Sequence, residues 1–180
     1  MKPDYLSSEM RRADLAWTDW PAIQAFLRNE LICRVAVHDF PYPYVIAQSY
    51  TFTEEAFLIH CSRFGKFASK LLENPHVTIE IDRPTALLKA PKGQNTSLEY
   101  YSVVARCQAE LKFATEEVIA HQNQALGKFR PEKGYAPILA DGQYSPPGQP
   151  KAPYIRFPFA DGASISGLPE EAFRRSQLGP

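Results

Sequence analysis

The chain has 180 residues, with 20 basic and 20 acidic side chains and therefore no formal net charge at pH 7. This length suits a single domain with a hydrophobic core, and 44% hydrophobic residues argue against intrinsic disorder. The balanced charge gives no indication of a nucleic-acid or membrane-surface partner. No signal-peptide pattern and no membrane-length apolar run occurs, so we expect a cytoplasmic protein.

The first part of the chain predicts one helix followed by three strands. Residues 17–31 repeat apolar side chains at helical spacing, with Thr18 as the predicted N-cap. Strands are predicted at 33–39, 44–52 and 56–62, which are rich in β-branched and aromatic residues. Because the connections are short, these three strands are expected to form an antiparallel meander.

The rest of the chain predicts two more helices and three more strands. The helices are expected at 65–75 and 115–129, and the strands at 76–83, 100–114 and 153–167. The strand 100–114 is expected to bend near Arg106. Residues 84–98 are predicted to be a loop, 130–153 an irregular segment rich in Pro and Gly, and 168–180 a loose tail. Six mostly antiparallel strands with few helices predict a mainly β (α+β) fold, a small β-barrel with flanking helices. We expect one domain over 1–180, with its core at about 10–167.

The stretch "FLIHCSRFGKF" at 57–67 places His60 beside Cys61 at the end of an apolar run. Adjacent residues of a regular strand point to opposite faces, so this pair is not predicted to act as nucleophile and base. A metal site is not indicated either, because the four histidines are scattered without a ligand spacing and the three cysteines form no CxxC pair. His60 can equally be a strand histidine with a backbone partner.

The same stretch has a third interpretation, as a site for an anion. A strand ends near Ser62, the chain turns at Gly65, and a helix begins with Lys66 in its first turn. Free backbone N–H groups and the helix dipole favour phosphate at such a place. Lys66 and Lys70 are four residues apart and share a helix face. An ordinary strand-to-helix turn with solvated cations remains the alternative.

Several short motifs follow one another in an order that resembles the pyridoxamine 5′-phosphate oxidase-like flavoproteins, nearest their nitroimidazole-resistance branch. They are Met10-Arg11-Arg12, Tyr42-Pro43-Tyr44-Val45, His60 with Ser62, Gly65-Lys66, Asn74-Pro75 and Ser102-Val103. The resemblance spans about residues 10–112. The chain departs from the family pattern at Phe67, where relatives carry a second cation, and at Ala47, where they carry proline.

This resemblance implies a six-stranded antiparallel split β-barrel that forms a homodimer with FMN at the subunit interface. It implies that the flavin ring lies along the strand residues Val45, Ile46, Ala47 and Gln48. The resemblance also implies that the ribityl and phosphate end of FMN is contacted by His60, Cys61, Ser62, Lys66 and Lys70. From the other subunit it implies Tyr101 and Ser102.

The resemblance also implies an FMN-dependent oxidoreductase that passes electrons from a nicotinamide donor to a small molecule, with nitroaromatics as one substrate class. His60 is the candidate catalytic residue, as a donor on the substrate side. The alternative is a carrier or sensor that binds flavin or haem without turnover, with His60 as the axial ligand of the haem version.

Overall fold

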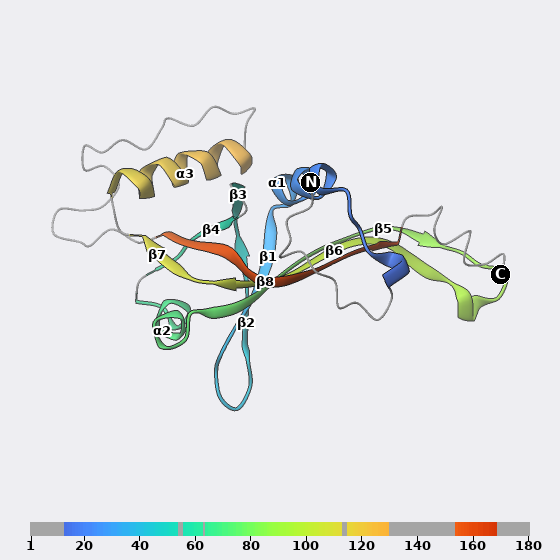
Figure 1. The fold of residues 1–180 in the computed structure, drawn as a ribbon, viewed down its shortest axis with the longest axis horizontal. Coiled ribbons are helices and arrows are strands. Elements are labelled where there is room, and N and C mark those ends of the chain that lie inside the picture. The colour runs from blue at the N-terminus through green and yellow to red at the C-terminus, as the bar shows by residue number, and fades with distance from the viewer. Residues whose placement is uncertain (1–12, 54–55, 63, 113–114, 130–153, 169–180) are drawn as a thin grey trace.

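The computed structural model describes residues 13–53, 56–62, 64–112, 115–129 and the backbone of 154–168 (Figure 1). The motif Met10-Arg11-Arg12, the segment 130–153 and the tail from 169 onward lie outside the described residues. Among the described residues, no helix is both long and apolar enough to cross a membrane.

The described residues form eight strands, three α-helices and two short 3-10 helices. The helices are η1 (Ala13–Leu15), α1 (Trp20–Asn29), α2 (Lys66–Glu73), η2 (Gly93–Asn95) and α3 (Thr115–Phe129). The strands are β1 (Ile32–Val37), β2 (Tyr44–Ser49), β3 (Thr51–Thr53), β4 (Ala56–His60), β5 (His76–Leu88), β6 (Ser97–Gln108), β7 (Glu110–Lys112) and β8 (Tyr154–Leu168). The predicted mainly β class is confirmed.

The strands pair in the order β2-β1-β5-β6-β8-β4-β3, and β7 pairs with β8 beside this path. Every pairing is antiparallel, as predicted. Within the described part of the chain, β2 and β3 end the path without pairing to each other. The structure therefore shows an open path of seven strands, with β7 beside it, in place of the predicted six-stranded barrel.

Two of the six predicted strands are each broken in two, which explains the difference in number. The predicted strand 44–52 breaks at Tyr50, whose buried hydroxyl donates to the Leu27 carbonyl at 2.9 Å. This anchor turns the chain, so that β2 pairs with β1 whereas β3 pairs with β4. The predicted strand 100–114 breaks at Ala109, whose N–H donates to the Pro75 carbonyl at 2.8 Å. Near Arg106, where a bend was expected, the register of the β6–β8 pairing shifts between Ala105 and Cys107, whereas the β5–β6 register stays regular.

The predicted loop 84–98 is wrong at both ends, because β5 and β6 continue as a long hairpin to the pair Leu88 and Ser97. Pro84 lies inside β5, at a register shift. The other neighbour, β1, pairs only with Val77–Glu80 of β5. Beyond that point one edge of β5 has no neighbour among the described strands, so proline without an N–H is tolerated there. Figure 1 shows β5, β6 and β8 together as a curved arm.

Helix α1 begins at Trp20 and its N-cap is Asp19, so the predicted Thr18 cap was wrong by one residue. The Asp19 carboxylate accepts a hydrogen bond from the Ala22 N–H at 3.2 Å. A carboxylate at this position also interacts favourably with the helix dipole. Helix α3 has the predicted bounds, and α2 lies within its predicted range.

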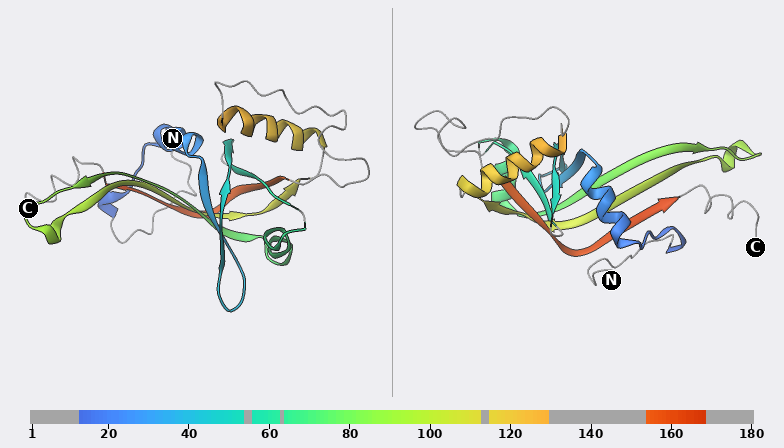
Figure 2. Two further views of the ribbon diagram at one scale, coloured as in Figure 1. Left: turned by 180° about the vertical axis from the view of Figure 1, so that it is seen from behind. Right: turned by 90° about the horizontal axis from the view of Figure 1, so that it is seen from above.

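One large cluster of buried side chains forms the core. Helix α1 contributes Ile23, Phe26 and Leu27, and α2 contributes Phe67 and Leu71. The strands β1, β5 and β6 add their inward-facing residues. In Figures 1 and 2, α1 and α3 lie on one side of the sheet, while α2 and the β1–β2 connection lie on the other. The two sides carry different charged groups, as described next.

Candidate functional site

The turn between β4 and α2 holds the predicted anion site. Gly65 is the N-cap of α2 and has an ordinary extended backbone, with φ −82°. A Cβ atom there would meet the Ser62 carbonyl oxygen at 3.7 Å, an ordinary van der Waals contact, so the turn does not require glycine. The Ser62 hydroxyl accepts a hydrogen bond from the Phe64 N–H at 3.3 Å. Ser62 therefore stabilises its own turn in this structure.

Lys66 and Lys70 of α2 converge on one carboxylate that follows β1. The Lys66 Nζ lies 2.7 Å and the Lys70 Nζ 3.2 Å from the two oxygens of Asp39. Lys70 also pairs with Glu73 at 2.8 Å, and Lys66 lies 4.8 Å from the centre of the Tyr44 ring. The two lysines predicted to share a helix face thus meet at one negative charge.

These ion pairs shift the ionisation of both partners. Lys66 first, and then Lys70, hold the pKa of Asp39 below its usual value. Glu73 first, and then Asp39, raise the pKa of Lys70. Asp39 is therefore ionised and Lys70 protonated at neutral pH. An external anion that binds here has to compete with Asp39 for the ammonium groups.

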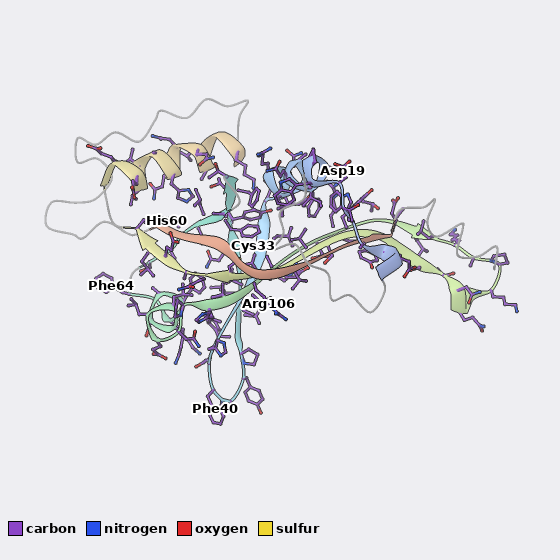
Figure 3. The ribbon with its side chains drawn as sticks, in the orientation of Figure 1. Asp19, Cys33, Phe40, His60, Phe64 and Arg106 are labelled. Carbon is purple, nitrogen blue, oxygen red and sulfur yellow. The ribbon has the colours of Figure 1, made fainter. Side chains whose placement is uncertain are left out.

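A groove of about 490 Å³ opens beside Asp39. The end of β1, the start of β5 and the end of β6 line it, and Arg106 adds a third cation. Figure 3 shows Arg106 on the side of the sheet that carries α2 and the β1–β2 connection. His76, also in the lining, has its Nδ1 3.1 Å from the Asn74 Oδ1. The lining combines an apolar strand surface with the charged groups of Asp39 and Arg106.

The four ring-side candidates lie on β2, the edge strand next to β1. Their side chains alternate between the two faces of the strand. Val45 and Ala47 are exposed, whereas Ile46 packs against the core and Gln48 is half-buried. Val45 is 54% exposed, a large apolar surface for a strand residue. This edge offers a flat apolar surface and strand backbone within the same region as Lys66.

His60 and Cys61 point to opposite faces of the chain, as the strand pattern predicts. Cys61 belongs to the main core, and burial raises the pKa of its thiol to about 11. Leu58, two residues before His60, packs instead with Val118 of α3. The charge of His60 affects the pKa of His121, also on α3. His60 therefore faces α3, and the structure does not bring it together with the α2 lysines (Figure 3).

His60 lies at the exposed end of β4, yet the atoms around its ring remove enough water to lower its pKa. It is therefore a neutral imidazole at neutral pH. In the described part of the chain, no group of three or more His, Cys, Asp or Glu side chains could hold a metal ion.

Tyr101 and Ser102 lie on β6, well along the arm. Tyr101 packs on Trp17, with ring centres 4.8 Å apart, and its partners across the sheet are Arg83 and Gly167. Five residues separate it from Arg106, which corresponds to about 16 Å along a strand. Tyr101 and Ser102 are therefore not brought to the α2 lysines of the same chain.

Three residues of this region were missed by the sequence analysis: Asp39, Tyr44 as a partner of Lys66, and Arg106. No local spacing could have identified Asp39, because 27 positions separate it from Lys66. The one available signal is that Asp39 stands at the end of a predicted strand, in "VAVHD".

The chain is similar to one protein family and to several proteins of known structure. A family model described as pyridoxamine 5′-phosphate oxidase matches residues 19–154. No curated protein matches the sequence. Among solved structures, a proposed 5-nitroimidazole antibiotic resistance protein from Bacteroides thetaiotaomicron is 17% identical, with a TM-score of 0.67 over 86% of this chain and 88% of that one.

Two further solved structures are of proteins named for their cofactors. A flavocytochrome from Azotobacter vinelandii is 19% identical, with a TM-score of 0.72 over 93% of this chain and 75% of that one. An FAD- and haem-binding protein from Mycobacterium smegmatis is 15% identical, with a TM-score of 0.68 over 91% of this chain and 80% of that one. At these identities the likeness shows a shared fold.

Proposed function

The chain belongs to the pyridoxamine 5′-phosphate oxidase family, as its motifs predicted, and from this premise we propose that it is an FMN-binding oxidoreductase. The observation that carries the proposal is the convergence of Lys66 and Lys70 beside the groove. Two similar structures come from a flavocytochrome and from an FAD- and haem-binding protein, which supports a flavin as the ligand.

The donors near α2 fit a phosphate dianion. Lys66 and Lys70 supply two ammonium groups, and the first turn of α2 has no side-chain cap on its N–H groups. A phosphate needs charged and N–H donors together, and a helix N-terminus provides the latter. Phe67, which stands where relatives carry a second cation, is buried in the core. Lys70, one turn further along, supplies the second charge instead.

The edge strand β2 fits the flavin ring. Its exposed face offers Val45 and Ala47, and its other face offers Ile46 and Gln48. An aromatic ring system of this size needs apolar walls with a few directed polar groups. When bound, a flavin supplies reversible transfer of one or two electrons. The residues of this chain would hold its phosphate and position its ring along β2.

The proposed reaction takes electrons from a nicotinamide donor to a small molecule, and nitroaromatics are one substrate class. The similarity in fold to the Bacteroides thetaiotaomicron protein supports this class. The proposed assembly is a homodimer, in which Tyr101 and Ser102 complete the site of the partner chain. Exposed aromatic residues on the β1–β2 connection, Phe40 and Tyr42, offer surface for such an interface.

Reconstitution with FMN tests the proposal. The purified protein, freed of ligand, should bind FMN saturably and quench its fluorescence, and reduced nicotinamide should bleach the bound flavin. Replacement of Lys66 by alanine should weaken FMN binding by about tenfold or more, because a charge-assisted hydrogen bond is lost. The matched control, Lys89→Ala, removes an exposed lysine of the arm and should leave FMN affinity unchanged. A wild-type protein that takes up no FMN rules the proposal out.

A haem-binding carrier is the second candidate, supported by the neutral imidazole of His60. Neutral imidazole is the form that ligates haem iron. Addition of haemin should then give a Soret band that is lost in His60→Ala but kept in His76→Ala. If both variants keep the band, His60 is not the ligand.

A further inference from the structure

A second groove, of about 380 Å³, lies between α1, β3 and α3, on the side of the sheet away from α2. Two cations, two amides and two hydroxyl groups line it: Arg28, Lys128, Asn29, Gln124, Thr51 and Thr53. None of these residues takes part in the flavin site proposed above. The volume is within the range of sites for small molecules.

Lys128 is the central group of this groove. Its Nζ donates to the Tyr50 carbonyl at 2.9 Å and lies 4.0 Å from the centre of the Tyr50 ring. Among the described residues, no carboxylate forms an ion pair with it. Burial lowers the pKa of Lys128 to about 8, against smaller raising contributions from Cys33 and then Glu30. Lys128 is thus a half-buried ammonium whose described partners are all uncharged.

Arg28 adds a second cation at the mouth of the groove. Its guanidinium is exposed and forms no ion pair with any residue that the structure describes. Asn29 and Gln124 place amide N–H donors on the same lining. Both helices present their last turn here, which contributes roughly −0.5 of a charge each. Against two full positive charges, the groove therefore keeps a net charge of about +1, which one negative charge would neutralise.

Phe52 belongs to the lining but offers a ligand almost no surface. It is 4% exposed, and its ring packs on Phe57 with centres 5.1 Å apart. The donors that a ligand meets in this groove are therefore the cationic and amide groups. A carboxylate, with one negative charge, matches the net charge of about +1, whereas a phosphate dianion exceeds it.

We propose that this groove binds a small organic carboxylate, with the carboxylate between Lys128 and Arg28. A guanidinium and an ammonium are the donors that bind carboxylate most strongly. The proposal does not depend on the flavin site, which lies across the sheet.

Binding should be coupled to the protonation of Lys128. A bound carboxylate favours the charged amine, so its pKa rises on binding and the complex takes up protons above pH 8. Affinity should therefore fall as the pH rises through 8. If the bound pKa lies above 9, affinity at pH 9 is about tenfold weaker than at pH 7.

Titration calorimetry of the full chain with sodium benzoate tests the proposal. The wild type should bind saturably at pH 7 and about tenfold more weakly at pH 9. Lys128→Met should bind about tenfold more weakly at pH 7 and lose the pH dependence. Lys128→Arg, which stays charged, should bind equally well at both pH values. Arg28→Gln should weaken binding yet keep the pH dependence, and Lys89→Met is the control without effect.

Three results would overturn the proposal: no saturable binding of benzoate by the wild type, full pH dependence in Lys128→Met, or equal binding of neutral benzyl alcohol. Stronger binding of inorganic phosphate than of benzoate would contradict the match of the groove to a single negative charge. If Lys128→Met fails to fold, Lys128→Arg serves as the test. The proposal then requires that Lys128→Arg binds benzoate as well at pH 9 as at pH 7. Saturation with benzoate should leave FMN affinity unchanged, which separates this site from the proposed flavin site.

Discussion

The molecule has two sets of lysines in opposite electrostatic surroundings, one on each side of the sheet. On the α2 side, Lys66 and Lys70 pair with Asp39, and acidic neighbours raise the pKa of Lys70. On the α3 side, Lys128 is half-buried against the Tyr50 ring and carbonyl, and burial lowers its pKa to about 8.

This difference shows that a lysine's surroundings, and not its presence, decide which ligand it can hold. Lys70, whose pKa is raised, remains charged over the whole physiological range, and both lysines of α2 already hold an anion. Lys128 loses its proton in mildly alkaline solution, and no described carboxylate competes for it. The α2 side therefore suits a dianion that can displace Asp39, whereas the α3 side suits a single charge whose binding depends on pH.

The largest expected effect is a change in how stability depends on pH when the charge of Lys128 is removed. The folded pKa of about 8 lies below the usual 10.5, so the unfolded chain binds more protons between these values. Stability should therefore rise with pH from about 8 to 10.5, by at most about 3 kcal/mol.

Urea unfolding of wild type and Lys128→Met at pH 7.5 and pH 10 measures this effect. The buried cysteines, whose pKa is raised, act in the opposite direction at alkaline pH. Both proteins contain these cysteines. Their contribution therefore cancels when the pH-dependent change in stability of Lys128→Met is subtracted from that of the wild type. An equal change with pH in both proteins would show that Lys128 is not desolvated.

Replacement of Asp39 by asparagine should have a smaller effect, on FMN affinity. Asp39 competes with the phosphate for Lys66 and Lys70, and exposed ion pairs of this kind are weak. FMN binding to Asp39→Asn should be about two- to fivefold tighter, as measured by fluorescence quenching. The control is Glu110→Gln, since Glu110 pairs with Lys112 on β7, which pairs with β8. Weaker FMN binding would instead identify Asp39 as the residue that orients the two lysines.

The smallest effect is expected for Glu73→Gln. Glu73 is 60% exposed and pairs with Lys70 within one helix turn, at 2.8 Å. Such pairs contribute little, so the thermal midpoint should change by less than about 2 °C in a calorimetric scan. A larger decrease in the thermal midpoint would mean that the stability of α2 depends on its ion pairs. The contrast between these exposed pairs and the half-buried Lys128 would then be weaker.

The fold could be predicted from the sequence wherever the local spacing of apolar residues alone defines a helix or strand. The bounds of α3 and the strand at β8 follow from local periodicity. The break at Tyr50 could not be predicted, because it depends on a hydrogen bond to Leu27, 23 positions away. The length of β5 was missed because Pro84 indicates a loop, yet it lies where β5 has lost β1 as a neighbour.

The candidate site shows the same limit. The sharing of a helix face by Lys66 and Lys70 follows from their spacing and is observed. Their partner Asp39 and the cation Arg106 come from other strands, and only the pairing of β1, β5 and β6 brings them near. The separation of His60 from these lysines depends on which face of β4 meets α3. Sequence spacing carries no information about that face.

A crystal structure of the protein with FMN is the most direct test of the proposed function. The account predicts the phosphate within hydrogen-bond distance of Lys66 and Lys70, with the Asp39 carboxylate displaced and the flavin ring along β2. A phosphate bound away from α2, with both lysines still paired to Asp39, would contradict it.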